Sequence, residues 1–317
     1  MKQKTIFVGI AVLIILIFNT CTRQSDFPVL KGPYLGQKPP GMTPEVFAPG
    51  VISTEDDEEL CSGFLDSGRV FVFSRLKPGE DWKKKPTYWM VMNEGVWSKP
   101  AEVPFNNLHP YNFSVAADGN TLYFSSCWSE KKPREILEED KIWRVKYADG
   151  IWDEPEKMGP EINADSVSPN YPTVAQNRTL YYMLDDPNRC GKVDLVYHKW
   201  IGDTYGKMMN VSAPVNTESN ELDPFVAPDE SYIIFLGNYK DSRGSWDLYI
   251  SYKDRGGNWT DPINMGNNIN TSGWESRPYV TQDGKYLFFS RGDEDPSWAD
   301  IYWVDAKIIE DIKKRTV

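Results

Sequence analysis

The chain repeats one sequence pattern five times, and this repetition constrains its fold more strongly than any other feature. Each unit has a proline-led stretch, a turn rich in Gly, Asp or Asn, and a run of apolar and aromatic residues, as in Pro278–Phe289. The turns lie at positions 67, 118, 176, 229 and 283, so the spacings are 51, 58, 53 and 54 residues. A period of about 50 residues with four short strands per unit is typical of a β-propeller blade.

The last unit lacks a fourth strand, because after Trp303 the chain continues into a charged, helix-like segment. A segment that resembles the fourth strands of other units lies near the N-terminus instead, at Pro44–Ile52. We expect it to pair with the last sheet, which would leave no exposed sheet edge. The sequence therefore predicts an all-β fold: a five-bladed β-propeller of four-stranded antiparallel blades, closed by an N-terminal strand. Six blades would need a further unit before residue 44, where Gly32–Met42 is rich in Pro and Gly.

The N-terminus has the pattern of an export signal. Lys2 and Lys4 precede the apolar run Phe7–Phe18, which is too short for a comfortable membrane span but suits a signal peptide. Cys21 follows directly, and this arrangement resembles a bacterial lipoprotein signal, so we expect Cys21 to be lipidated. The predicted organisation is a signal peptide at 1–20, a tether at 21–43, the propeller at 44–305 and a charged C-terminal tail at 306–317.

The charge of the chain limits its partners. It carries 46 acidic and 35 basic residues, a net charge of −11. Such a field disfavours nucleic acid and repels anionic lipid headgroups. We therefore expect no nucleic-acid partner, membrane contact only through the N-terminal lipid, and a monomer. The predicted location is the cell envelope, as an outer-membrane-anchored lipoprotein that faces the periplasm or the cell surface.

The repeats resemble those of the TolB-type, WD-like β-propeller family. The resemblance covers about residues 44–305, and its most faithful carriers are Asp118–Phe124 and Asp283–Phe289. The third and fourth units depart from it at their turns, with Gln176–Arg178 and Asp229–Glu230. The resemblance implies a bacterial envelope protein that acts as a binding module or as a structural partner in an envelope complex. The resemblance thus implies a propeller scaffold and an envelope location, and it implies no particular enzymatic reaction.

Binding residues are expected on one face of the disc. The connections between second and third strands are long and varied, and they share a face with the inter-blade connections. Long loops on a rigid scaffold are where binding usually resides. This long-loop face is predicted to carry any ligand site.

Polar side chains recur just before or within each first strand, where they could ring the mouth of the central channel. Glu59, Glu221 and Glu275 stand eight residues before the turns, and the positions two residues later hold Cys61, Asn112, Asn170, Asp223 and Arg277. The carboxylates among them could hold a calcium ion or a cationic ligand. Alternatively, they accept backbone N–H bonds and pin neighbouring blades together. The recurrence favours this second interpretation, because repetition is what a scaffold produces.

Residues that do not recur are better candidates for ligand contacts. His109 lies in an inter-blade connection, and Arg75 and Arg291 end second strands on either side of the predicted closure. Together with Arg277 they could recognise an anionic group such as a uronate or sialate, or form surface ion pairs of little energetic value. Tryptophan faces suit sugar rings and protein hot spots, and we expect five loop tryptophans to be exposed. These are Trp82, Trp128, Trp246, Trp274 and Trp298.

The remaining patterns identify no chemistry. Cys127 and Cys190 follow corresponding strands, but nothing in the spacing shows that they can form a disulfide. No zinc-site spacing, phosphate-binding glycine loop or catalytic triad is evident, so no catalytic residue, metal or cofactor is assigned. The sequence favours a non-enzymatic binding module for a glycan or envelope protein. The alternative is a glycoside hydrolase or lyase with its site at the channel mouth.

Overall fold

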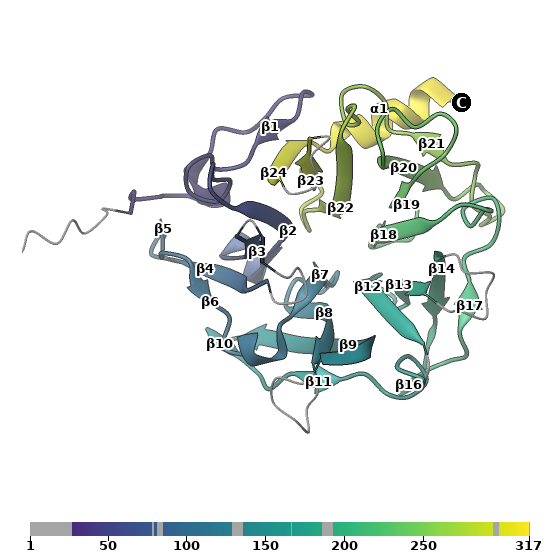
Figure 1. Ribbon diagram of the computed structural model, residues 1–317, viewed down its shortest axis with the longest axis horizontal. Coiled ribbons are helices and arrows are strands. Elements are labelled where there is room, and N and C mark those ends of the chain that lie inside the picture. Colours follow the sequence, from purple (N-terminus) through teal and green to yellow (C-terminus); the bar gives the residue numbers. More distant parts are fainter. Residues whose placement is uncertain are drawn as a thin grey trace, which may run out of the picture.

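The computed structural model describes residues 27–77, 79–80, 85–128, 136–165, 167–185, 193–293 and 298–316. Five antiparallel sheets are arranged around a central axis, as Figure 1 shows. The predicted all-β fold and the five-bladed β-propeller of four-stranded blades are therefore confirmed, and the six-bladed alternative is wrong.

The strands of each blade run in chain order from the axis outwards, except in the last blade. Blade 1 comprises β2 (Glu58–Leu65), β3 (Val70–Leu76), β4 (Thr87–Asn93), β5 (Val96–Trp97) and β6 (Ala101–Glu102). Blade 2 comprises β7 (Tyr111–Val115), β8 (Thr121–Trp128), β9 (Ile136–Ala148), β10 (Ile151–Trp152) and β11 (Glu156–Lys157). Blade 3 comprises β12 (Ser168–Val174), β13 (Leu180–Asp185), β14 (Val193–His198) and β17 (Met209–Asn210), with the ribbon β15 (Trp200–Ile201) and β16 (Thr204–Tyr205) beside it in sequence.

The last two blades follow the same plan. Blade 4 comprises β18 (Glu221–Val226), β19 (Tyr232–Gly237), β20 (Asp247–Tyr252) and β21 (Ile263–Asn264). Blade 5 comprises β22 (Trp274–Val280), β23 (Tyr286–Gly292), β24 (Ala299–Asp305) and β1 (Glu45–Val46). Short 3-10 turns occur at η1 (Pro33–Gly36), η2 (Asp66–Gly68) and η4 (Asn106–Leu108).

The N-terminal strand closes the ring, as the sequence predicts. β1 pairs with β24 in antiparallel register, with Glu45 opposite Trp303 and Val46 opposite Tyr302. The strand has only two residues, and the segment after it continues the attachment: the Phe47 N–H donates to the Ile301 carbonyl at 2.7 Å. Phe47 is fully buried, and its ring lies 5.0 Å from that of Phe288 in blade 5 and 5.3 Å from that of Phe71 in blade 1. One aromatic side chain therefore joins the first and last blades across the closure.

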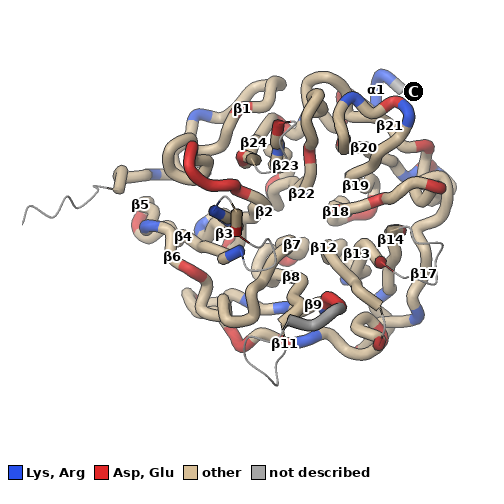
Figure 2. Tube along the Cα trace, in the orientation of Figure 1, with Lys and Arg blue, Asp and Glu red and all other residues tan. Residues whose placement is uncertain are grey.

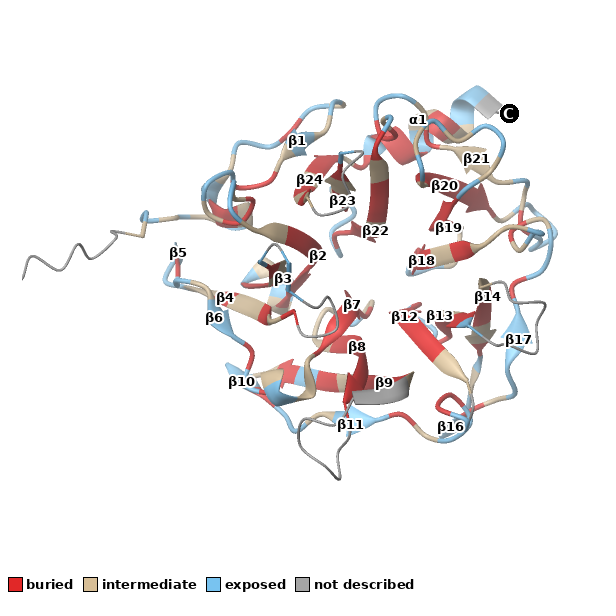
Figure 3. Cartoon of the chain, in the orientation of Figure 1, coloured by how far each residue is buried: buried red, intermediate tan, exposed pale blue. Residues whose placement is uncertain are grey.

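The core consists of apolar contacts between neighbouring sheets. Figure 3 shows buried residues along the inner strands and exposed ones concentrated on the outer loops. The second strands β3, β13, β19 and β23 are almost wholly buried, because their β-branched and aromatic residues pack on both faces. Most tryptophans and tyrosines therefore belong to the core rather than to a binding surface.

Both terminal segments of the described residues pack against the disc. In the region predicted as a tether, the Gly32 N–H donates to Gly95 at 2.9 Å, Leu35 is buried, and the Tyr34 hydroxyl donates to Asp283 at 2.9 Å. The predicted charged tail forms α1 (Lys307–Thr316), whose Ile308, Ile309 and Ile312 are buried.

Within the described residues, no helix is long and apolar enough to cross a membrane. The predicted signal peptide and the lipidation site Cys21 lie outside the described residues.

Candidate functional site

Every innermost strand contains a bulge at the same place. The register of β2, β7, β12, β18 and β22 slips against the second strand of its own blade. At each slip one non-glycine residue adopts the left-handed backbone, with φ between 44° and 54°. The five residues are Cys61, Asn112, Tyr171, Asp223 and Arg277. Such a conformation costs about 1–3 kcal/mol per residue, and bulges often redirect a side chain towards a functional site.

The five bulge residues lie around the central channel. The innermost strands contact one another in sequence around the axis, including β2 with β22 across the closure (Figure 1). The start of β2 pairs with the end of β3, so the bulges lie towards the face from which the long β3–β4 connection emerges. The repeat therefore supplies one position per blade, but the residues there are a thiol, an amide, a phenol, a carboxylate and a guanidinium. This asymmetry distinguishes the ring of bulges from the scaffold around it.

Lys85 joins this ring from the end of the β3–β4 connection. It is only 1% exposed, and its Nζ has no hydrogen-bond partner among the residues that the structure describes. Burial lowers the Lys85 pKa to about 8, and the neighbouring positive charge of Arg277 contributes to the decrease. The Arg277 side chain is only partly buried, its Nη1 donates to Ser276 Oγ at 2.8 Å, and its buried Nε lacks a partner within the described residues.

Two carboxylates balance these two cations. Asp223 is 7% exposed, and burial raises its pKa, while Arg277 opposes this shift through its charge and through a hydrogen bond from its backbone N–H. Burial also raises the Glu58 pKa, against the charges of Arg277 and Lys85. Burial raises the Tyr171 pKa well above its usual value, with a further contribution from the adjacent Cys61 thiol. The Tyr171 hydroxyl therefore stays protonated at neutral pH.

The opposite side of the ring is a hydrogen-bonded polar network between blades 2 and 3. Asn112 Nδ2 donates to Asn170 Oδ1 at 3.1 Å, and Asn170 Nδ2 donates to Asp140 at 2.6 Å. The Tyr111 hydroxyl donates to the same aspartate. The buried Oδ1 of Asn112 has no hydrogen-bond donor among the described residues. We name Glu58, Cys61, Lys85, Asn112, Tyr171, Asp223 and Arg277 the channel cluster.

The recurring glutamates have a different environment. Glu59, Glu221 and Glu275 are all fully buried. Each accepts hydrogen bonds from the backbone N–H and hydroxyl of a threonine in the preceding connection, namely Thr54, Thr217 and Thr271. They hold the inter-blade connections in place, which is the scaffolding interpretation of the sequence pattern. Burial raises the Glu59 pKa to about 7, and the bonds from Thr54 and the charge of Arg75 oppose the increase.

Arg75 and Arg291 complete the same structural unit. Arg75 Nε donates to Glu59 at 2.8 Å, and its Nη2 donates to the carbonyls of Val51 and Ile52. Arg291 makes the equivalent bonds, to Glu275 at 3.0 Å and to the carbonyls at 268 and 269. Both guanidinium groups are therefore occupied within the fold. The structure does not bring them together with Arg277 in the channel cluster.

The aromatic candidates are less exposed than the sequence suggests. Trp128 is only 8% exposed, and its ring stacks on His109 with centroids 3.9 Å apart. Trp274 and Trp246 are half-buried and form a bridge between blades 4 and 5. The predicted exposure of Trp128 is wrong, because the fold packs it beneath the connection that carries His109. Trp298 is also half-buried, and Trp82 lies outside the described residues.

Sequence reasoning finds part of the channel cluster. Asp223 and Arg277 are predicted and lie in it, as do the ring positions Cys61 and Asn112. In blade 3 the bulge falls on Tyr171, one residue beyond the predicted Asn170. The signal for this shift is the proline after the bulge, because Pro172, Pro224 and Pro278 occupy equivalent positions. Lys85 and Glu58 are missed, since neither is at a position that recurs in the other units.

Two further expectations concern metals and cysteines. Within the described residues, no group of three or more His, Cys, Asp or Glu side chains is arranged to hold a metal ion. Glu59, Glu221 and Glu275, the candidate calcium ligands, are already bonded to threonines. Cys127 is buried, and Cys190 lies outside the described residues, so their pairing stays a prediction.

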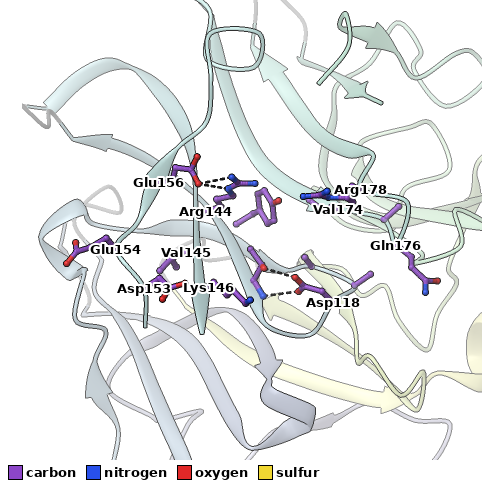
Figure 4. A pocket seen from close by; sticks show the side chains of 15 residues that line it. Asp118, Arg144, Val145, Lys146, Asp153, Glu154, Glu156, Val174, Gln176 and Arg178 are labelled. Atoms are coloured by element: carbon purple, nitrogen blue, oxygen red, sulfur yellow. Dashed lines mark hydrogen bonds and ion pairs between the residues drawn. The ribbon is translucent and has the colours of Figure 1, made fainter. Parts of the chain in front are cut away.

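A groove of about 590 Å³ lies between blades 2 and 3 on the face of the Asp-Gly turns (Figure 4). Arg144 there donates from Nε and Nη2 to Glu156 at 2.9 and 2.7 Å, and Asp118 accepts bonds within its own turn. Arg178 lies over the ring of Trp200 at 4.0 Å. A similar groove of about 440 Å³ lies between blades 1 and 2. The groove thus recurs with the repeat, and Arg144, Asp118 and Arg178 in it are engaged by other residues of the protein, so the channel cluster is the better candidate.

Comparisons with known proteins agree with the fold. No protein-family model matches the sequence, and no curated protein matches it either. Among solved structures, a complex of BT0996 with RGII has a TM-score of 0.52 at 12% identity, with coverage of 86% of the present protein and 91% of the other. A structure described as a glycoside hydrolase has a TM-score of 0.51 at 12% identity, with coverage of 88% and 92%.

TolB-like propellers are also among the structural neighbours. TolB from Acinetobacter baumannii is similar with a TM-score of 0.47 at 11% identity, covering 79% of the present protein. The matched region spans 57% of the length of that TolB protein. At these identities the similarity shows the fold alone. The fold and the site define the protein as a five-bladed β-propeller with an asymmetric polar cluster at its channel mouth.

Proposed function

We propose that the protein is a non-enzymatic, ligand-binding propeller of the bacterial cell envelope that engages a glycan at the channel mouth of its long-loop face. The observation that carries this proposal is the channel cluster. Different polar side chains from all five blades converge there, on backbone positions that cost conformational energy. Charged residues on an ordinary surface need no unfavourable backbone conformation. A preorganised binding site often does, because its side chains must be held in fixed positions.

Two features favour binding over catalysis. The Tyr171 hydroxyl is held protonated by burial and by its neighbours, so it is not an activated nucleophile. The two carboxylates lie beside two cations, so the cluster is close to neutral overall. Amide, hydroxyl and charged groups in one cluster suit the hydroxyl-rich surface of a sugar. An envelope protein is the alternative partner, and a structural role within an envelope complex is a weaker alternative.

A carbohydrate-active enzyme is the second candidate, and one observation favours it. Asp223 and Glu58 both lie in the cluster with pKa values raised by burial, and such carboxyl groups can act as general acids. A glycoside hydrolase needs two carboxyl groups on opposite sides of the scissile bond. Asp223 and Glu58 come from different blades, and they are the two carboxyl groups of the cluster that would form this pair.

The envelope location rests on the export signal and on the acidic surface. Figure 2 shows acidic and basic residues interspersed around the disc in the part of the chain that the structure describes. We propose that Cys21 is the lipidated N-terminus and that the disc is held at the outer membrane by this lipid alone. Metabolic labelling with a fatty acid checks this proposal, with Cys21→Ser as the control that should lose both the label and the membrane fraction.

The decisive test combines a glycan array with turnover assays on the same glycans, using the purified full-length protein. We expect glycan binding without product formation, and loss of binding in Asp223→Asn. The matched control is Asp203→Asn, which changes an exposed carboxylate in the turn between β15 and β16. Product formation that disappears in Asp223→Asn or Glu58→Gln, with the fold intact, would establish the enzyme instead. Absence of any glycan binding would overturn the proposal.

A further inference from the structure

We infer that the channel cluster recognises the carboxylate of an acidic sugar, with Lys85 and Arg277 as the residues that determine this specificity. The inference rests on the proposed glycan-binding function and names the chemical class of the ligand.

The first argument is the state of Lys85. A buried ammonium group normally has its donors satisfied, because leaving them unpaired costs several kcal/mol. Lys85 Nζ has no hydrogen-bond partner in the described part of the protein, although its side chain is 1% exposed. The unpaired ammonium group of Lys85 therefore destabilises the unliganded protein, and a bound anion would remove this unfavourable energy.

The second argument is the geometry of Arg277. Its side chain keeps some exposure, so solvent reaches the guanidinium group, but its Nε is buried and lacks an acceptor among the described residues. Asp223 lies close enough to Arg277 for their charges to interact, but in the described structure neither cluster carboxylate forms an ion pair with either cation. Nη1 is occupied by Ser276 Oγ, so the edge formed by Nε and Nη2 is the part of the guanidinium that can bind a ligand. A planar carboxylate with two oxygens is the group that such a fork binds best.

The third argument separates an acidic sugar from other anions. The unpaired Oδ1 of Asn112 needs a ligand that carries a hydrogen-bond donor. An acidic sugar has hydroxyl donors beside its carboxylate. Asp223 and Glu58 can also accept hydroxyl groups, and their negative charge opposes a dianion such as phosphate. The cluster thus combines donors for one carboxylate with acceptors for neighbouring hydroxyls. Lys85 is almost fully buried and Arg277 only partly, so a single sugar residue suits the cluster better than a folded protein surface does.

The experiment compares matched pairs of oligosaccharides that differ only in one sugar, a uronate or the corresponding neutral hexose. Affinity is measured by calorimetry, with inorganic phosphate and a short peptide ending in a free carboxylate as additional probes. The variants are Lys85→Met and Arg277→Gln in the full-length protein. The matched control is Lys146→Met, which removes an exposed lysine from the groove of Figure 4.

We expect the uronate member of a pair to bind at least about ten-fold more tightly than the neutral member, and each cluster variant to lose about ten-fold or more in affinity for it. Lys146→Met should bind like the wild type. Lys85→Met removes a buried charge and should fold, so it keeps the test decisive if Arg277→Gln does not fold.

Each contrary result has a separate meaning. Equal affinity for both members of every pair, or unchanged uronate binding by Lys85→Met, would overturn this inference while the proposed glycan-binding function stands. Phosphate or the peptide binding as tightly as the uronate would also overturn it. If neither member of any pair binds, the proposed function itself fails.

Discussion

Glu59 and Arg75 show how a residue can look functional in sequence and serve the scaffold in space. The carboxylate is fully buried, and the guanidinium joins it to two backbone carbonyls of the preceding connection. The same unit occurs in blade 5 with Glu275 and Arg291, and in blade 4 Tyr239 donates to the glutamate instead. The recurrence of the glutamates already favoured this interpretation, but the partner arginines could be identified only from the fold.

The Arg75 pair gives a test of this scaffolding role. Arg75→Met should lower the free energy of unfolding by about 3 kcal/mol, because it leaves the buried Glu59 carboxylate without its cation. The matched control is Arg69→Met, since Arg69 is 60% exposed and pairs with Asp66 on the surface. That change should cost less than about 1 kcal/mol. Equal effects of the two substitutions in denaturant unfolding would contradict the assignment.

Lys85 should make stability depend on pH in the alkaline range. Its pKa falls from an ordinary 10.5 to about 8 in the folded protein, where it faces Arg277, Cys61, Glu58 and Asp223. Between these values the unfolded protein takes up more protons than the folded one, so the contribution of this group to stability rises with pH. Below pH 8 the charged, buried Lys85 destabilises the fold.

The corresponding variant is Lys85→Met. At pH 7 the variant should be more stable than the wild type by about 1–3 kcal/mol. It should also lack the increase in the free energy of unfolding that Lys85 gives the wild type between about pH 8 and 10. Thermal unfolding of both proteins across this range checks the expectation, with Lys146→Met as the exposed control. A wild type and a Lys85→Met variant with parallel pH profiles would show that the ammonium is not buried in solution.

At the scale of elements, the bulge in each inner strand matters most. A regular strand alternates its side chains between two faces, whereas a bulge inserts an extra residue and redirects it. The proline after the bulge in β12, β18 and β22 is compatible with this local loss of regular pairing. The prolines are visible in the sequence, but their meaning as bulge markers appears only when the strands are paired. The spacing from the turn alone therefore predicts Asn170 in blade 3, one residue before the bulge at Tyr171.

The closing strand β1 is the second informative element. It is only two residues long, so most of its attachment comes from the residues after it: the Phe47 backbone bond, the Phe47 ring and Ser53 Oγ, which accepts the Ile301 N–H at 3.2 Å. Phe47→Ala should therefore lower stability by about 3–5 kcal/mol through the lost burial and the cavity left behind. The comparison is Phe27→Ala, since Phe27 is only partly buried at the edge of the disc. Similar losses in urea unfolding for both variants would argue against this role of Phe47.

At the scale of the whole molecule, the ring depends on contacts between residues far apart in the sequence. A protein beginning at residue 54 lacks β1 and Phe47, so it exposes the edge of β24 and the apolar surface between blades 5 and 1. An exposed strand edge promotes association between molecules. We expect this truncated protein to unfold at a lower temperature and to form dimers or aggregates. A protein beginning at residue 27 should remain monomeric by light scattering, and a monomeric, equally stable protein beginning at residue 54 would contradict the closure.

The repeat period, the turn residues and the aromatic-rich second strands predicted five blades, and the resemblance of Pro44–Ile52 to the fourth strands predicted their N-terminal closure. These features are local, and they recur because every blade must bury its faces in the same way. The channel cluster could not be derived in this manner, because its members come from five blades and the β3–β4 connection. Lys85 ends a run of three lysines in the sequence, and only the closed ring places its ammonium beside Arg277, Asp223 and Glu58. A pattern that repeats in every blade can be recognised in the sequence. A cluster of different residues, one or two from each blade, forms only when the blades are assembled into the ring.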